Sequence, residues 1–183
     1  MDAARRIDRK KIYDGRVVRL SVDTVRLPNG KRAELELVRH RGAAAIVPLD
    51  DDGQVLLVRQ YRYAARRWLL EVPAGTLERQ EPPERCARRE VEEETGYRPS
   101  RIVPLGWIFT TPGFTDEKIW LYLATDLSPT GARLDEDEVL TVERVPLADA
   151  VERAASGEIV DAKSICALSR AARALGFRVA TGS

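Results

Sequence analysis

The segment RREVEEETG, residues 88–96, places four glutamates within nine positions and restricts the fold more than any other stretch. A run of charges usually forms the solvent-facing side of a surface helix. Pro83 near the start of this region and Gly96 at its end are typical helix start and stop signals. The first question is therefore which of the four glutamates would face solvent and which would face the protein core.

Helical rotation divides the glutamates between two sides. Successive residues of an α-helix turn by about 100°, so residues three, four and seven positions apart share a face. By this rotation Glu94 lies between the apolar Ala87 and Val91, Glu90 lies beside it, and Glu93 borders the same stripe. Carboxylates gathered on a packed side repel one another unless a cation compensates them. Their oxygen atoms suit a hard divalent cation such as Mg²⁺.

The remaining sequence indicates an α/β protein in which a small β-rich segment precedes a mixed sheet with helices. Period-two alternation in residues 12–40, with a turn at Pro28–Asn29–Gly30, predicts a β-hairpin. The apolar runs AAAIVPLD and QVLLVRQYR, separated by DDG, predict a second hairpin with strands buried on both faces. Further strands are expected in WLLEVPAG, 101–110, 118–125 and LTVERVP. Two helices are expected after them, at Leu147–Ser156 and Ala162–Leu175.

Composition excludes several classes of function. The chain has 30 Lys and Arg against 29 Asp and Glu, so charge gives no support for a nucleic-acid or membrane partner. There is no apolar stretch of membrane-spanning length and no signal peptide, which predicts a cytoplasmic protein with Cys86 and Cys166 as free thiols. Phosphate-binding glycine loops are absent, and the single histidine, His40, argues against a histidine-rich zinc site.

Together with the residues before it, the glutamate segment forms a longer pattern, GTLERQEPPERCARREVEEETGY, residues 75–97. It resembles the signature of the Nudix hydrolases, G-x5-E-x7-R-E-U-x-E-E-x-G-U, where U is a bulky apolar or aromatic residue. The matching positions are Gly75, Glu81, Arg89, Glu90, Val91, Glu93, Glu94, Gly96 and Tyr97. A match of this length arises by chance about once in a million chains of this size. The sequence departs from many Nudix proteins at Gln80, where they have a glycine before the glutamate.

The resemblance covers roughly residues 12–175 and points to the ADP-ribose pyrophosphatase branch. Pro112, sixteen positions after Gly96, marks that branch, and the tail GEIVDAKSICAL is similar to it. The resemblance implies a Nudix fold, a mixed β-sheet sandwiched between helices, in residues 41–183. It also implies that the antiparallel β segment at residues 1–40 exchanges between the subunits of a homodimer, so that each active site uses both chains.

By resemblance, the reaction is hydrolysis of the diphosphate of ADP-ribose to AMP and ribose 5-phosphate, with Mg²⁺, Mn²⁺ or another divalent ion as cofactor. The implied metal ligands are Glu90, Glu94, the main-chain carbonyl of Ala74, and Glu138. Glu136, in the acidic loop LDEDE, matches the general base, and Glu93 and Arg89 assist; Arg89 lies four residues before Glu93, where the two can pair on a helix. The reverse assignment of Glu136 and Glu138 is the alternative.

Substrate contacts are implied for a further set of residues, namely Arg62, Arg41, Thr111, Pro112, Gly113 and Glu117. A guanidinium such as that of Arg62 fits phosphate geometry with two hydrogen bonds. Trp68 and Phe114 are candidates for stacking on a base, although core packing is favoured for Trp68. The signature specifies the chemistry and not the second moiety, so other nucleoside diphosphate sugars or dinucleotides are alternative substrates. An alternative of another class is a nucleotide-binding sensor without catalysis.

Overall fold

The computed structural model describes residues 3–131 and 139–177. The chain divides into two compact units: the first comprises Met1–Gly42 and Phe109–Lys118, and the second comprises Ala43–Ile108 and Ile119–Ser183. The predicted boundary lay after residue 40. The division differs from that prediction mainly because the short segment around residues 109–118 belongs with the N-terminal strands.

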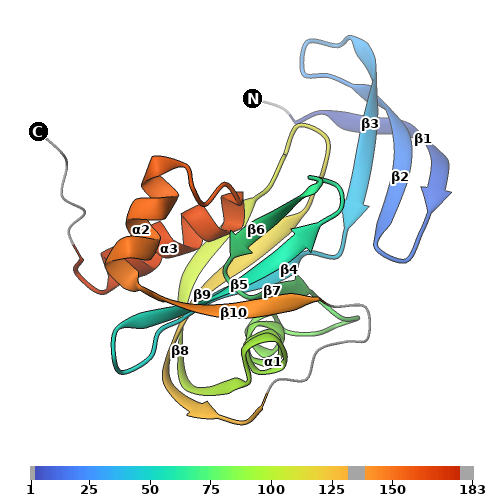
Figure 1. Cartoon of the computed structure of the whole chain (residues 1–183). Helices are drawn as coiled ribbons and strands as arrows, with labels where there is room; N and C mark the ends of the chain where they lie inside the picture. The colour runs from blue at the N-terminus through green and yellow to red at the C-terminus, as the bar shows by residue number, and fades with distance from the viewer. Residues whose placement is uncertain (1–2, 132–138, 178–183) are drawn as a thin grey trace, which may run out of the picture. The chain divides into compact units, whose positions relative to one another are not determined.

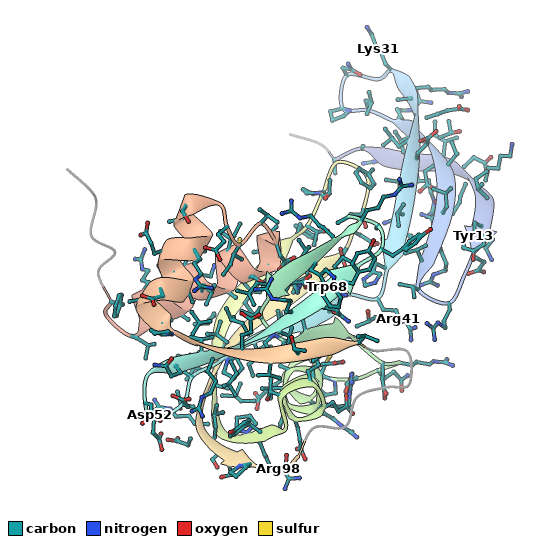
Figure 2. All side chains as sticks on the ribbon, viewed as in Figure 1. Tyr13, Lys31, Arg41, Asp52, Trp68 and Arg98 are labelled. Carbon is teal, nitrogen blue, oxygen red and sulfur yellow. The ribbon has the colours of Figure 1, made fainter. Side chains whose placement is uncertain are left out.

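The first unit is an antiparallel sheet with the strand order β1-β2-β3, formed by Arg5–Asp14, Val18–Arg26 and Arg32–His40. The predicted turn between β2 and β3 is present: the amide of Gly30 donates to Leu27 O at 2.9 Å, and Gly30 has a φ of 83°. This positive φ explains the glycine, because the left-handed region is open to it at little cost. On β2, alternate side chains are buried and β1 is exposed along its whole length, with Tyr13 projecting from it (Figure 2).

Within the described residues, the second unit contains two further sheets and three helices. One sheet has the order β10-β5-β6, and the other has the order β7-β4-β9-β8. The strands are β4 Ala43–Pro48, β5 Gln54–Arg62, β6 Arg67–Glu71, β7 Ala74–Thr76, β8 Tyr97–Phe109, β9 Lys118–Pro129 and β10 Leu140–Pro146. The helices are α1 Pro83–Thr95, α2 Leu147–Ser156 and α3 Ala162–Ala174. No helix in the described part of the chain is long and apolar enough to cross a membrane.

The strands β4 and β5 do not form the predicted hairpin. They lie in different sheets and share only an isolated bridge between Leu49 and Val55. Both edges of β4 are occupied, by antiparallel β7 and by parallel β9, while β5 pairs with β6 and β10. An apolar run indicates that a strand is buried on both faces, but it does not specify which strands pair with it. The hairpin was predicted from closeness in sequence alone, and β4 instead pairs with strands that are distant in the chain.

The mixed sheet is covered by helices on both faces (Figure 1). Strand β4 shows this most clearly, because its side chains alternate between two apolar clusters. Ala43, Ala45 and Val47 belong to the cluster that includes α2 and α3, whereas Ala44 and Ile46 belong to the cluster that includes α1. The predicted arrangement of a mixed sheet sandwiched between helices is confirmed.

Candidate active site

Helix α1 carries the glutamate-rich segment, and its limits follow the sequence signals. Pro82 precedes the first turn in an extended conformation, and Pro83 occupies the first helical position, where no amide donor is required. The helix ends at Gly96, which has a φ of 75° and whose amide donates to Glu92 O. Cys86, Ala87 and Val91 anchor the helix against the sheet. Packing of this apolar stripe fixes the rotation of α1 and therefore the direction of each glutamate.

Two of the four glutamates are buried, as the helical rotation predicted. Glu90 is 8% exposed and Glu94 is 3% exposed, and both lie on the side of α1 that packs against the protein. Glu93 is partly exposed at the border, and Glu92 pairs with Arg98 on the surface at 2.7 Å. The structure thus places two carboxylates one helical turn apart in an environment that strengthens their mutual repulsion.

The backbone of β7 lies next to these two carboxylates. The amide of Ala74 donates to Glu94 Oε2 at 3.2 Å. Gly75 approaches Glu90 so closely that a Cβ at this position would stand 1.8 Å from Glu90 Oε1. The glycine of the signature is therefore required by space, because any side chain here would displace the carboxylate. Ala74, predicted to offer its carbonyl, lies beside the predicted carboxylate ligands.

Arg89 connects the carboxylates of this region. Its guanidinium donates to both oxygens of Glu81 at 3.1 Å and to Glu93 at 2.9 Å, and it forms an ion pair with Glu90 at 2.6 Å. Burial would lower the pKa of Arg89, but the hydrogen bonds with Glu81 and the charge of Glu90 outweigh it and raise the pKa. Arg89 therefore stays charged, and the predicted pair with Glu93 is present.

The donor atoms around Glu90 and Glu94 suit a hard cation. Their side chains offer only oxygen, and the main chain at Ala74 adds a carbonyl. The thiol of Cys86 donates to Gly75 O at 3.4 Å, and burial raises its pKa to about 12. Within residues 3–131 and 139–177, no three Asp, Glu, His or Cys side chains form a metal-binding group. Glu136 and Glu138, predicted to complete the site, lie outside the described residues.

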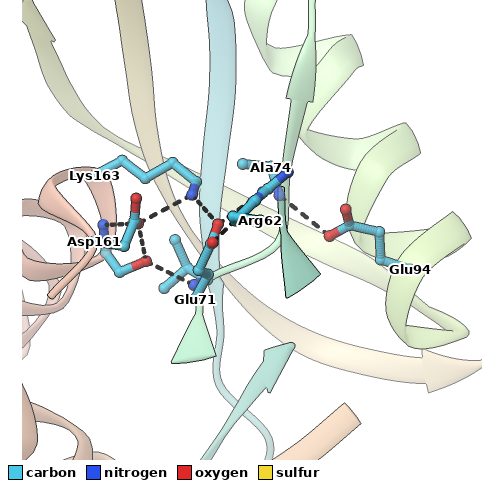
Figure 3. A network of polar contacts seen from close by, with 8 residues as sticks. Arg62, Glu71, Ala74, Glu94, Asp161 and Lys163 are labelled. Carbon is cyan, nitrogen blue, oxygen red and sulfur yellow. Dashed lines mark hydrogen bonds and ion pairs between the residues drawn. The ribbon is translucent and has the colours of Figure 1, made fainter. Parts of the chain in front are cut away.

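Arg62 is held by a carboxylate that sequence analysis did not single out. Its Nε and Nη2 donate to the two oxygens of Glu71 at 2.9 and 2.7 Å. Glu71 is also paired with Lys163, which binds Asp161 at 3.0 Å (Figure 3). The only signal in the sequence is an acidic residue inside the apolar run WLLEV, together with the tail segment that contains Asp161 and Lys163.

The other predicted substrate contacts lie in the first unit. Thr111 opens a turn in which its carbonyl accepts from Phe114 and Thr115, with Pro112 and Gly113 inside it. Glu117 accepts a hydrogen bond from Thr110 at 2.9 Å and lies 3.3 Å from His40 Nδ1. Arg41 donates to the carbonyl of Arg16 at 3.1 Å. These side chains are thus ordered by contacts within their own unit.

Trp68 does not pack in the core, contrary to the expectation for it. It is half-exposed on β6 and contacts the ring of Tyr61 edge-on, with the ring centroids 5.7 Å apart. The cross-strand register explains this position, because Tyr61 and Trp68 are directly opposite each other on β5 and β6. They project from the face opposite to Arg62, whose side chain follows the alternation of the strand.

Comparison with known proteins agrees with the geometry. The NUDIX domain family model matches residues 38–168. An ADP-ribose pyrophosphatase of Bacillus subtilis is 42% identical over 88% of this chain and 89% of its own, and one of Mycobacterium tuberculosis is 40% identical over 87% and 78%. A methanol dehydrogenase activator of Bacillus methanolicus is 41% identical over 88% and 89%. A crystal structure of an ADP compounds hydrolase superposes with a TM-score of 0.85 at 23% identity, covering 96% of both chains. The chain belongs to the NUDIX family.

Proposed function

We propose that this protein is a divalent-metal-dependent ADP-ribose pyrophosphatase that forms AMP and ribose 5-phosphate. The observation that carries the proposal is the pair of buried carboxylates, Glu90 and Glu94, held against the backbone of β7 within a complete Nudix signature. Two relatives with about 40% identity over most of the chain bear the name ADP-ribose pyrophosphatase. The substrate is inferred from those names.

Mg²⁺ is the cation that we assign to this site. Glu90, Glu94 and the carbonyl of Ala74 would hold it, and Glu138 would add a further oxygen. When bound, the cation neutralises diphosphate oxygens and lowers the pKa of a coordinated water. The chain itself orients the donors: Arg89 fixes Glu81 and Glu93, and the amide of Ala74 fixes Glu94. Glu136 is proposed to accept the proton of the attacking water.

ADP-ribose, the proposed substrate, is expected to contact Arg62, Arg41, Thr111, Pro112, Gly113 and Glu117. We further propose that the protein acts as a homodimer in the cytoplasm. Support for the dimer comes from β1, an edge strand that is exposed over its entire length and carries the exposed apolar residues Ile7, Ile12 and Tyr13. The unpaired backbone groups of an edge strand are a template for pairing with another chain, and a second copy paired there would also cover these apolar side chains. Light scattering that finds a stable, fully active monomer would exclude this dimer.

A panel of nucleoside diphosphate compounds tests the substrate. Purified protein with Mg²⁺ is incubated with ADP-ribose, GDP-mannose, UDP-glucose and NADH, and the products are separated by chromatography. We expect AMP and ribose 5-phosphate from ADP-ribose at the highest kcat/KM. GDP-mannose is included because a GDP-mannose pyrophosphatase of Cronobacter sakazakii is 34% identical over 75% of this chain. Faster cleavage of another compound would replace ADP-ribose, and cleavage of none would overturn the proposal.

Two isosteric variants on one helix test the carboxylate pair. Glu94→Gln keeps the shape of the buried side chain but removes the charge that a cation requires. We expect kcat to fall by at least about 100-fold, since even groups that only orient metal ligands are worth 10- to 100-fold. Glu92→Gln is the matched control, because Glu92 points outward and pairs with Arg98. Equal activity of the two variants would contradict the assignment of Glu94.

A further inference from the structure

Glu71 is a buried carboxylate that has no part in the reaction proposed above. It is 1% exposed and lies between the buried Leu70 and Val72 at the end of β6. Burial would raise its pKa, but hydrogen bonds from Arg62 and the charge of Lys163 outweigh it and lower the pKa. An ionised carboxylate at this depth is retained only with paired cations, because an unpaired one costs several kcal/mol.

The second cation comes from α3 and is itself fixed. Lys163 Nζ contacts both Glu71 and Asp161, the latter at 3.0 Å. Asp161 caps α3 by accepting the amide of Ser164 at 2.9 Å, and the hydroxyl of Ser164 accepts the amide of Val72 at 2.9 Å. Two carboxylates and two cations therefore form a charge-balanced network that joins α3 to the end of β6 (Figure 3). Such a network is weak evidence for stability, because the cost of removing its charges from water offsets their attraction.

The network lies close to the candidate metal site: β6 ends at Glu71, β7 begins three residues later at Ala74, and the amide of Ala74 donates to Glu94 Oε2 at 3.2 Å (Figure 3). Arg62 is the last residue of β5, and its side chain is 40% exposed. The hydrogen bonds with Glu71 are the main cause of the raised pKa of Arg62, and the charge of Glu94 adds to the increase. The two bonds to Glu71 use Nε and Nη2, so the Nη1 donors are directed away from Glu71.

We propose that Glu71, supported by Lys163, is a positioning residue that presents the Nη1 side of Arg62 to the diphosphate of the nucleotide. This inference rests on the proposed function, because it takes a nucleoside diphosphate as the ligand of the site. A bidentate carboxylate holds the planar guanidinium in one orientation, so little rotamer entropy is lost when a phosphate oxygen binds. It also holds Arg62 away from Glu94, to which a released arginine would be attracted.

A double-mutant cycle separates positioning from general stability. Glu71→Gln keeps the side-chain volume but loses the charge that orients Arg62, and Arg62→Ala removes the residue through which it acts. We expect Glu71→Gln to lower kcat/KM for ADP-ribose by about 10- to 100-fold, chiefly through KM. Calorimetry in the presence of EDTA should show a similar loss of ADP-ribose affinity without any turnover. In the Arg62→Ala background, Glu71→Gln should change both quantities by less than about twofold.

The chain offers a matched control on the same strand. Arg59 of β5 donates through two nitrogens to Glu143 of β10, and it lies on the opposite face of β5 from Arg62. Glu143→Gln therefore removes the same kind of pair away from the site, and it should leave kcat/KM and ADP-ribose affinity unchanged. If Glu71→Gln does not fold, Lys163→Met replaces it in the cycle, with an expected loss of about 3- to 10-fold.

The possible results separate the role of Glu71 from the proposed function of the protein. Equal losses from Glu71→Gln with and without Arg62 would overturn the inference, and so would a loss of the same size from Glu143→Gln. A wild-type protein that binds ADP-ribose without cleaving it would overturn the proposed function, and the binding cycle would still decide the role of Glu71. A wild-type protein that does not bind ADP-ribose would overturn both.

Discussion

Gly75→Ala should inactivate the protein while leaving its fold intact. The added Cβ would lie 1.8 Å from Glu90 Oε1, whereas ordinary contacts begin at 3.4 Å, so the carboxylate must withdraw by about 1.6 Å. A displacement of about 1 Å at a reacting site can cost 100-fold, and we expect kcat to fall by at least about that factor. The clash is with the end of a flexible side chain, so a forced rotamer should cost only about 1 kcal/mol of stability.

The assay compares kcat for ADP-ribose at saturating Mg²⁺ with the midpoint of thermal unfolding. A second substitution tests the cause directly. Glu90→Asp shortens the side chain by one methylene group, about 1.5 Å, which is close to the withdrawal that alanine demands. Alone it should reduce activity, but added to Gly75→Ala it should cost nothing further or restore activity. Wild-type kcat in Gly75→Ala, or fully multiplicative losses in the double variant, would refute the reasoning.

Two further predictions concern other buried groups. The hydrogen bonds from Arg9 lower the pKa of Asp23 from 3.8 to about 2, so this ion pair stabilises the first unit above about pH 4 and is lost as pH falls toward 2. Arg9→Gln should lower the stability of the first unit at pH 7, so hydrogen exchange of β2 should be faster than in wild type, and this difference should shrink below pH 4; a constant difference would contradict the prediction. Burial raises the pKa of Cys86 to about 12, so iodoacetamide at pH 8 should alkylate Cys166 first; early labelling of Cys86 in the folded protein would contradict its burial.

The parts of the fold that sequence predicted are those determined by local spacing. Helix α1 and the inward direction of Glu90 and Glu94 follow from the 3.6-residue period and from Pro83 and Gly96, and the structure confirms them. The strand β10 and the helix α2 have the predicted limits for the same reason. In each case the residues that determine the element lie within one or two turns or strand lengths of each other.

The parts that sequence did not predict depend on distant partners. β4 and β5 are adjacent apolar runs, yet their sheet partners are chosen by backbone hydrogen bonds with β7, β9, β6 and β10, which no local pattern encodes. Glu71 is an isolated acidic residue in a strand, and one of its two cations, Lys163, lies 92 positions away. A buried carboxylate of this kind becomes recognisable only when the residues that compensate it are known.

Charge balance distinguishes the two clusters of the second unit. Around Glu71, two cations face two carboxylates, so adding another charge would cost energy. Around α1, the single guanidinium of Arg89 is shared by three carboxylates, Glu81, Glu90 and Glu93, and the buried Glu94 lies one turn beyond Glu90. A divalent cation bound there would compensate several neighbouring carboxylates at once, whereas the cluster around Glu71 already holds two cations. The cluster around Glu71 orients Arg62, the cation that we propose for the diphosphate of the substrate, and the carboxylates of α1 are those that would hold the metal.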